Sequence, residues 1–233
     1  MRNHQRHWIY PMAALFFLMI LTAACKKEDD TELPPDSVPT NVTVTDIDGN
    51  IYHTVTIGTQ TWMVENLKVT HYRNGEPIQH VSDMEFNLTS GAYTNYDNSG
   101  QNGDEYGRLY NWYAVFDGPL LAPEGWHIAD KAEWETLMNY LGGTDFAGVK
   151  LKETGTEHWQ APNANATNSS GFTALPGGDC FNGFQDINVT AAFWSATEAS
   201  SNWAYYFLIR NNDQVAVSLV DKTFGLSVRC VKD

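Results

Sequence analysis

The sequence has few basic residues, few cysteines and no long hydrophobic run. Its 233 residues include 14 Lys and Arg against 28 Asp and Glu, which gives a formal net charge of -14. A nucleic-acid partner is disfavoured, because Lys and Arg supply the contacts that release counterions from a polyanion. The same imbalance argues against attachment to anionic lipid by charge alone. Apolar residues nevertheless make up 42% of the chain, which is enough to build a folded core.

The longest apolar stretch lies near the N-terminus and is too short to span a bilayer as a helix. Residues 12–21 are apolar and follow a segment with Arg2 and Arg6 but no acid, whereas a spanning helix needs about 20 such residues. A basic start, a short apolar run and small residues before Cys25 are typical of a bacterial lipoprotein signal, with an ordinary secretory signal as the alternative. We therefore expect residues 1–24 to be removed and an acylated Cys25 to hold the protein to a membrane.

The segment after Cys25 has the composition of an extended linker. Residues 25–40 contain three prolines, several acids and almost no bulky apolar side chain. Within it, residues 27–30 (Lys-Glu-Asp-Asp) resemble the tract that directs Bacteroidota lipoproteins to the outer face of the outer membrane, although a plain solvated tether is the alternative. We therefore expect a lipid-anchored protein that faces the exterior, with a single domain over residues 41–233.

Hydrophobic periodicity predicts an α+β domain. Alternation and turn residues predict short strands near both ends of the domain, over residues 41–45, 51–57, 62–64, 203–209, 215–220 and 226–231. A helix is predicted over 130–141, because Asp130 and Glu133 form a capping box ahead of a single apolar stripe. A weaker helix is predicted over 108–116. Strands at both ends and helices between them suggest that the terminal strands pair in one sheet.

Six strings occur in an order that resembles a known family. They cover residues 62–67, 107–114, 125–135, 171–178, 193–197 and 224–233. Together they resemble the Fibrobacter succinogenes major paralogous domain over about residues 45–233. The resemblance implies a C-type-lectin-like fold, with short twisted antiparallel sheets, two central helices and many loops, related to that of formylglycine-generating sulfatase-modifying enzymes. It implies no established reaction, and a fold does not settle function.

The sequence contains no recognised catalytic constellation. His-Glu-x-x-His, Gly-x-Ser-x-Gly and phosphate-binding glycine motifs do not occur. Cys180 and Cys230 would lie outside the reducing cytosol, where two thiols favour a disulfide. Their separation does not match the close cysteine pair that holds copper in the sulfatase-modifying enzymes. We therefore expect no enzymatic activity, and the alternative is a catalytically altered member of that branch with a metal in a pocket lined by His127, Glu65 or Cys180.

A polar, glycine-bearing stretch is the candidate metal site. Its candidate calcium ligands are Asp97, Asn98, Asn102, Asp104 and Glu105. Calcium takes six to eight hard oxygen ligands, which such a stretch can supply. The alternative is a polar surface loop, because the same residues are common in turns. No other cofactor is expected.

An aromatic strand followed by a polar turn is the candidate binding surface. Its candidate residues are Trp203, Tyr205, Tyr206, Arg210, Asn211, Asn212 and Asp213. Strand alternation places Trp203 and Tyr205 on one face and Tyr206 on the other, and one of these faces must be core. Tyr and Trp offer rigid contact area with one polar group each. We expect an extracellular glycan or protein ligand, and the alternative is a structural unit of a surface adhesin.

Overall fold

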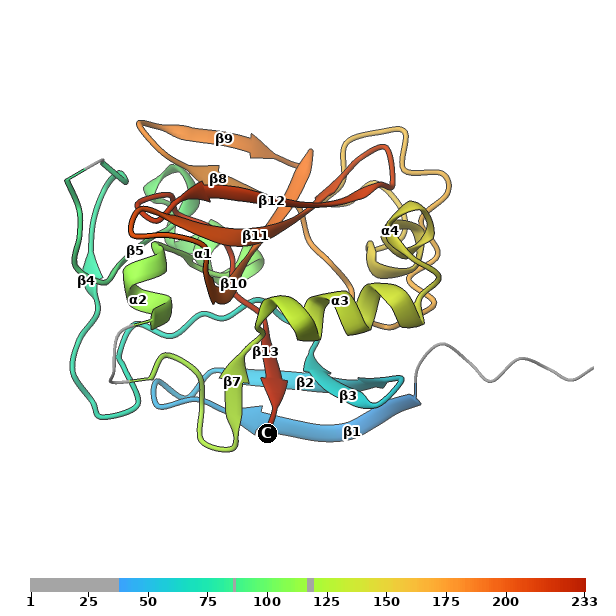
Figure 1. Cartoon of the computed structure of the whole chain (residues 1–233), viewed down its shortest axis with the longest axis horizontal. Helices are drawn as coiled ribbons and strands as arrows, with labels where there is room; N and C mark the ends of the chain where they lie inside the picture. Colours follow the sequence, from blue (N-terminus) through green and yellow to red (C-terminus); the bar gives the residue numbers. More distant parts are fainter. Residues whose placement is uncertain (1–37, 86, 117–119) are drawn as a thin grey trace, which may run out of the picture. The chain divides into compact units, whose positions relative to one another are not determined.

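The structure is a computed structural model that describes residues 38–85, 87–116 and 120–233 (Figure 1). The strands of this part of the chain are β1 (Val38–Thr45), β2 (Ile51–Ile57), β3 (Gln60–Met63), β4 (Gln79–His80), β5 (Ala92–Thr94), β6 (Leu109–Tyr110), β7 (Trp126–Ile128), β8 (Gly177–Cys180), β9 (Phe184–Ile187), β10 (Thr190–Glu198), β11 (Trp203–Arg210), β12 (Val215–Asp221) and β13 (Cys230–Lys232). The helices are η1 (Tyr96–Asn98), α1 (Gly100–Tyr106), α2 (Trp112–Phe116), α3 (Lys131–Tyr140) and α4 (Thr144–Leu151). Among these helices, none is both long enough and apolar enough to span a membrane.

The first sheet joins the two ends of the domain. Its strand order is β1-β2-β3-β13-β7, and Val231 of β13 pairs with Trp62 of β3. The tight turn between β2 and β3 uses Gly58 at a φ of +61°, a conformation that costs glycine little. The prediction that the terminal strands pair in one sheet is therefore confirmed.

The second sheet is made mainly from the C-terminal third of the chain. Its order is β12-β11-β10-β8-β9, and a third, three-stranded sheet has the order β4-β5-β6. β8 runs parallel to β10, and β4 runs parallel to β5. The expected antiparallel pairing is therefore interrupted at these two pairs, and the many strands with a few short helices are consistent with the predicted α+β class.

The helices match the sequence where the local signals are strong. α3 begins after Asp130, and the predicted capping box with Glu133 is present. The weak helix expected over 108–116 is instead β6 followed by the short α2. The described residues also contain α1 and α4, which the sequence did not predict.

Two hydrophobic clusters cover opposite faces of the second sheet. Trp194 and Leu208 belong to the first core cluster, and Phe193 and Phe207 belong to the second core cluster. Because successive side chains of a strand point to opposite faces, β10 and β11 are buried on both sides at their centre. In Figure 1, α3 lies between the two five-stranded sheets, and its Trp134 stacks on Phe207 within the second core cluster.

Candidate functional site

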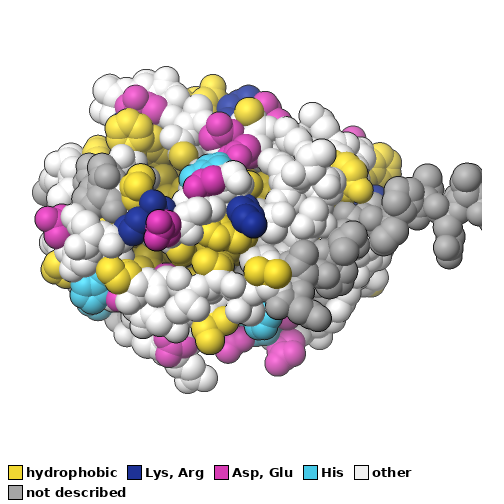
Figure 2. All heavy atoms as spheres, turned by 90° about the horizontal axis from the view of Figure 1, so that it is seen from below, with side chains coloured by type: hydrophobic (Ala, Val, Ile, Leu, Met, Phe, Trp, Pro, Cys, Tyr) yellow, Lys and Arg dark blue, Asp and Glu magenta, His cyan; other side chains and the backbone are white. Residues whose placement is uncertain are grey.

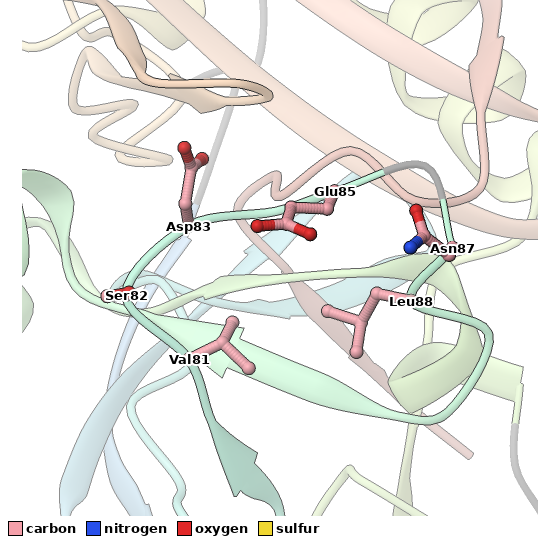
Figure 3. A pocket seen from close by; sticks show the side chains of 6 residues that line it. All are labelled: Val81, Ser82, Asp83, Glu85, Asn87 and Leu88. Atoms are coloured by element: carbon pink, nitrogen blue, oxygen red, sulfur yellow. The ribbon is translucent and has the colours of Figure 1, made fainter.

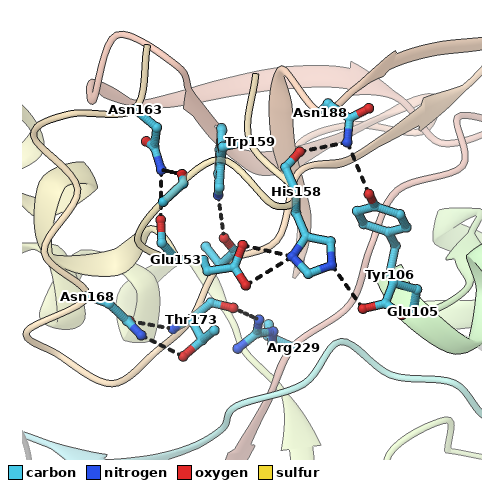
Figure 4. A network of polar contacts seen from close by, with 12 residues as sticks. Glu105, Tyr106, Glu153, His158, Trp159, Asn163, Asn168, Thr173, Asn188 and Arg229 are labelled. Atoms are coloured by element: carbon cyan, nitrogen blue, oxygen red, sulfur yellow. Dashed lines mark hydrogen bonds and ion pairs between the residues drawn. The ribbon is translucent and has the colours of Figure 1, made fainter. Parts of the chain in front are cut away.

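Arg229 is a fully buried cation at the centre of the domain. Its Nε donates to Asn66 Oδ1 at 2.6 Å, its Nη1 donates to the carbonyl oxygens of Met63 (2.9 Å) and Phe172 (2.8 Å), and its Nη2 donates to that of Thr173 (3.0 Å). The guanidinium also lies 4.3 Å from the centroid of the Phe172 ring. Burial lowers its pKa to about 9. Three of the six sequence strings meet at this one side chain, as Figure 4 shows in part.

The tryptophans of the other strings are also interior residues. Trp112 Nε1 donates to the Ser195 carbonyl at 3.0 Å, and Trp194 Nε1 donates to the Tyr110 carbonyl at 2.6 Å. Trp134 is buried. A buried indole N–H usually has a hydrogen-bond partner, and these two bonds join separate strings. The strings that carry the family resemblance therefore build the interior.

The predicted calcium ligands do not converge. Glu105 pairs with His158 at 2.9 Å and Asp104 with Arg108 at 3.3 Å, while Asn102 Nδ2 donates to the Tyr96 carbonyl at 3.1 Å. Among the described residues, no group of three or more His, Cys, Asp or Glu side chains could hold a metal ion. The stretch, including Asp97 and Asn98, folds as η1 and α1 rather than as a ligand-wrapping loop, and calcium binding there stays a prediction.

His158 bridges two carboxylates from different parts of the chain. Its Nδ1 lies 2.8 Å from a Glu153 oxygen and its Nε2 lies 2.9 Å from Glu105 (Figure 4). Burial lowers the pKa of His158, but the hydrogen bonds and charges of Glu153 and Glu105 outweigh it, so the pKa lies above 6.5. Next to the imidazole, Asn188 Nδ2 donates to Tyr106 Oη at 3.0 Å. This network fastens α1 to the segment after α4.

The His158 bridge should make stability pH-dependent. Because the folded-state pKa is raised, its contribution is fully present below the unfolded value of 6.5 and is lost as the pH rises through the folded value. We expect His158→Gln to cost about 1 kcal/mol of unfolding free energy at pH 5.5 and less above pH 8. Urea unfolding at both values measures this. A cost that stays constant or grows with pH would contradict it.

Cys180 and Cys230 are both free, buried thiols, so the predicted disulfide is wrong in this structure. They belong to different hydrophobic clusters, and Cys180 Sγ donates instead to Asp83 Oδ1 at 3.2 Å. Burial raises the pKa of each thiol to about 12, which keeps both protonated. Asp83 also borders a pocket of about 400 Å³ (Figure 3). Its Oδ1 accepts hydrogen bonds from Cys180 Sγ and from the Gly183 N–H.

The residues of the alternative metal pocket have separate partners. Glu65 lies 2.7 Å from His53 Nδ1, Cys180 contacts Asp83, and His127 lies between Glu133 and Asp233. Nothing in these described contacts brings His127, Glu65 and Cys180 to one ion.

The predicted binding residues split into two groups. Trp203 is 47% exposed, and Tyr205 is half-buried beside Leu219, its cross-strand neighbour, which is 45% exposed. Lys131 Nζ lies 5.4 Å from the centroid of the Tyr205 ring and forms an ion pair with Glu135. We call Trp203, Tyr205, Leu219 and Lys131 the aromatic ledge. It lies next to the free edge of the second sheet, since β12 is the outermost strand.

The polar turn after β11 is tied into the fold. Asp213 forms an ion pair with the buried Lys152 and accepts from Asn165 Nδ2 at 3.0 Å, and Lys152 Nζ donates to the Asn211 carbonyl at 3.3 Å. α4 carries Gly148 here, because a Cβ would stand 1.9 Å from the Asp213 carbonyl oxygen. Asp213 therefore has partners within the fold, and ligand binding by this turn stays a prediction.

The other predicted binding residues do not join the ledge either. Tyr206 packs against the first core cluster, Asn212 Nδ2 donates to Gln214 Oε1 at 3.3 Å, and Arg210 is exposed at the far end of β11 from Trp203.

The six strings build the buried centre of this fold. The exposed aromatic ledge is separate from that centre. The family model described as the Fibrobacter succinogenes major domain matches residues 55–232, and the chain belongs to this family. Neither the curated proteins nor the solved structures contain a significant match to the chain. Trp203, Tyr205 and Leu219 lie outside the six strings, so sequence analysis could locate them only as an aromatic strand and missed Leu219.

Proposed function

We propose that this protein is a lipoprotein, acylated at Cys25, that holds a C-type-lectin-like domain on the outer face of the outer membrane and binds an extracellular protein there. Cys25 and the linker lie outside the described residues, so the anchor rests on the basic start, the short apolar run and the small residues before Cys25. The C-type-lectin-like assignment is supported by the pairing of the terminal strands around a second sheet of hairpins.

The aromatic ledge carries the proposal. Side chains of Trp and Tyr that are partly exposed beside a leucine form the kind of surface that protein hot spots use. A protein is favoured over a glycan because Lys131 lies over the Tyr205 ring and competes with a stacked sugar. Asp213, one of the predicted binding residues, forms an ion pair with Lys152. The ledge therefore has apolar contact area without a converging set of polar groups.

Trp203→Ala tests this function. We expect it to weaken binding of the partner by about 30-fold or more, since removal of a central aromatic anchor costs about 2 kcal/mol. Phe146→Ala is the matched control, because Phe146 is 64% exposed on α4 and lies outside the ledge. Binding is measured by capture from the cell-surface protein fraction, followed by titration of the captured protein. An equal loss of affinity in both variants would contradict the proposal. Binding to a glycan array that depends on Trp203 would show that the ligand is a glycan and not a protein.

A further inference from the structure

Lys152 is another fully buried cation, and it forms an ion pair with Asp213. It directly follows α4, and its side chain is 0% exposed, while that of Asp213 is 13% exposed. The Trp159 ring lies beside the ammonium group, with its centroid 4.7 Å from Nζ. Removal of two charges from water is costly, and their attraction offsets this cost only when the remaining polar groups are well hydrogen-bonded. We call Lys152 and Asp213 the buried pair.

One oxygen of the buried pair has no hydrogen bond. Lys152 Nζ lies within ion-pair distance of Asp213 Oδ1, yet Oδ1 is buried and accepts no hydrogen bond from any residue that the structure describes. The two atoms are therefore close without hydrogen-bond geometry. The other groups have partners, since Nζ donates to the Asn211 carbonyl at 3.3 Å and Oδ2 accepts from Asn165 Nδ2 at 3.0 Å.

Two other lysine–carboxylate pairs differ from the buried pair. In Lys131–Glu135 and Lys222–Glu198, Nζ donates a hydrogen bond to the carboxylate, and the acids are 43% and 48% exposed, respectively. Figure 2 shows a similar surface arrangement, in which a basic side chain lies beside an acidic one at the face of the molecule. A carboxylate oxygen that is buried without a hydrogen bond is costly, so the buried pair is an unfavourable arrangement for two ions.

An amide between the two side chains accounts for all of these contacts. Nζ of an amide keeps one hydrogen, which the Asn211 carbonyl is placed to accept, and the carbonyl oxygen keeps the hydrogen bond from Asn165. The atom that amide formation removes is one carboxylate oxygen, and Oδ1 of Asp213 is the oxygen without a hydrogen bond. Condensation also replaces two buried charges by one neutral group.

We propose that Lys152 and Asp213 condense into an intramolecular isopeptide bond. One proton passes from Nζ to Oδ1, which gives a neutral amine and a neutral acid. The amine then attacks Cγ, and Asn165 stabilises the charge that develops on Oδ2. The bond between Cγ and Oδ1 breaks, and Oδ1 leaves as water with a second proton from the nitrogen. The ammonium and the carboxylate together equal the amide and one water, so atoms and charge balance without a co-reactant.

Peptide mapping of the full-length protein tests the bond. The protein is denatured, which separates ion pairs, and digested with trypsin, which cuts after a free lysine but not after an acylated one. We expect no cleavage after Lys152 and a branched peptide that joins Lys152 to Asp213 and is lighter than its two parts by one water. Cleavage after Lys152 with separate peptides of unmodified mass would overturn the proposal. This result does not depend on the proposed function, because neither residue belongs to the aromatic ledge.

Two variants and an internal control make the result specific. Lys152→Arg keeps the charge but offers no amine nucleophile, so it should give no branched peptide. Lys131 and Glu135, which are hydrogen-bonded and open to water, should stay unlinked in the same digest. Asn165→Ala, at an exposed position, should slow bond formation by about tenfold or more, measured by sampling during cell-free synthesis. A branched peptide from Lys152→Arg, or a wild-type rate in Asn165→Ala, would contradict the step. If Lys152→Arg does not fold, the wild-type map decides.

Discussion

Arg229→Met is expected to lower the free energy of unfolding by about 4 kcal/mol or more, because four hydrogen bonds at about 1 kcal/mol each are lost and their acceptors stay buried. The acceptors come from Met63, Asn66, Phe172 and Thr173, which lie 56 to 166 positions away in sequence. The total free energy of unfolding of a domain is only about 5–15 kcal/mol, so the variant should be barely folded at 25 °C. Urea unfolding followed by tryptophan fluorescence measures the loss.

Two companion variants make the Arg229 result specific. Arg210→Met is the control, because Arg210 is exposed on β11, and it should change stability by less than about 0.5 kcal/mol. Arg229→Lys keeps the charge but cannot reach four acceptors from one planar group, so it should recover only part of the loss. A loss below about 1 kcal/mol for Arg229→Met would show that the buried guanidinium does not hold these strings together.

Cys25→Ser is expected to abolish attachment of lipid to the protein completely and to leave residues 1–24 on the chain. A thioether-linked lipid and an N-acyl chain bury many methylene groups at about 0.8 kcal/mol each, and serine accepts neither a thioether nor signal cleavage of the lipoprotein type. Metabolic labelling with an alkyne fatty acid, together with fractionation with and without detergent, measures the effect. Ser37→Ala, a change within the linker, is the control and should stay labelled and membrane-bound. Fatty-acid label on Cys25→Ser, or an unlabelled wild type, would contradict the anchor.

The local parts of the fold could be predicted from the sequence. The start of α3 follows from Asp130 and Glu133, because a capping box satisfies backbone N–H groups without help from distant residues. The meander of β1 to β3 follows from alternation and glycine turns in the same way. Where the signal is local, the predicted and observed elements agree to within a few residues.

The errors arise where distant contacts decide. Residues 97–105 have the composition of a loop, yet Ser99 caps α1 and His158 fastens Glu105 from 53 positions away. The disulfide was predicted because both thiols would lie outside the reducing cytosol, and this reason says nothing about the distance between them. In the structure, Cys180 and Cys230 belong to different hydrophobic clusters. The alternation of side chains along β11 correctly assigned its residues to two faces. It did not show that hydrophobic clusters would cover both faces at the centre of the strand.

The candidate site was predictable only in part for the same reason. Trp203 and Tyr205 stand out as aromatic residues in a strand, but Leu219 joins them through the β11–β12 register. Asp213 forms its ion pair with Lys152, which directly follows α4. The six strings explain the family match and the interior, including Arg229, while the ledge lies mainly between them. A family match of this kind therefore identifies the scaffold without naming the ligand.

The central claim, that the exposed ledge of a surface-anchored domain contacts a protein partner, is tested most directly by photo-crosslinking on intact cells. A photoreactive phenylalanine replaces Trp203 in one variant and Phe146 in the other, both exposed aromatic positions. The account predicts one discrete cross-linked protein from position 203 and none from position 146. Adducts of equal pattern from both positions, or no adduct from position 203 on cells that display the protein, would contradict it.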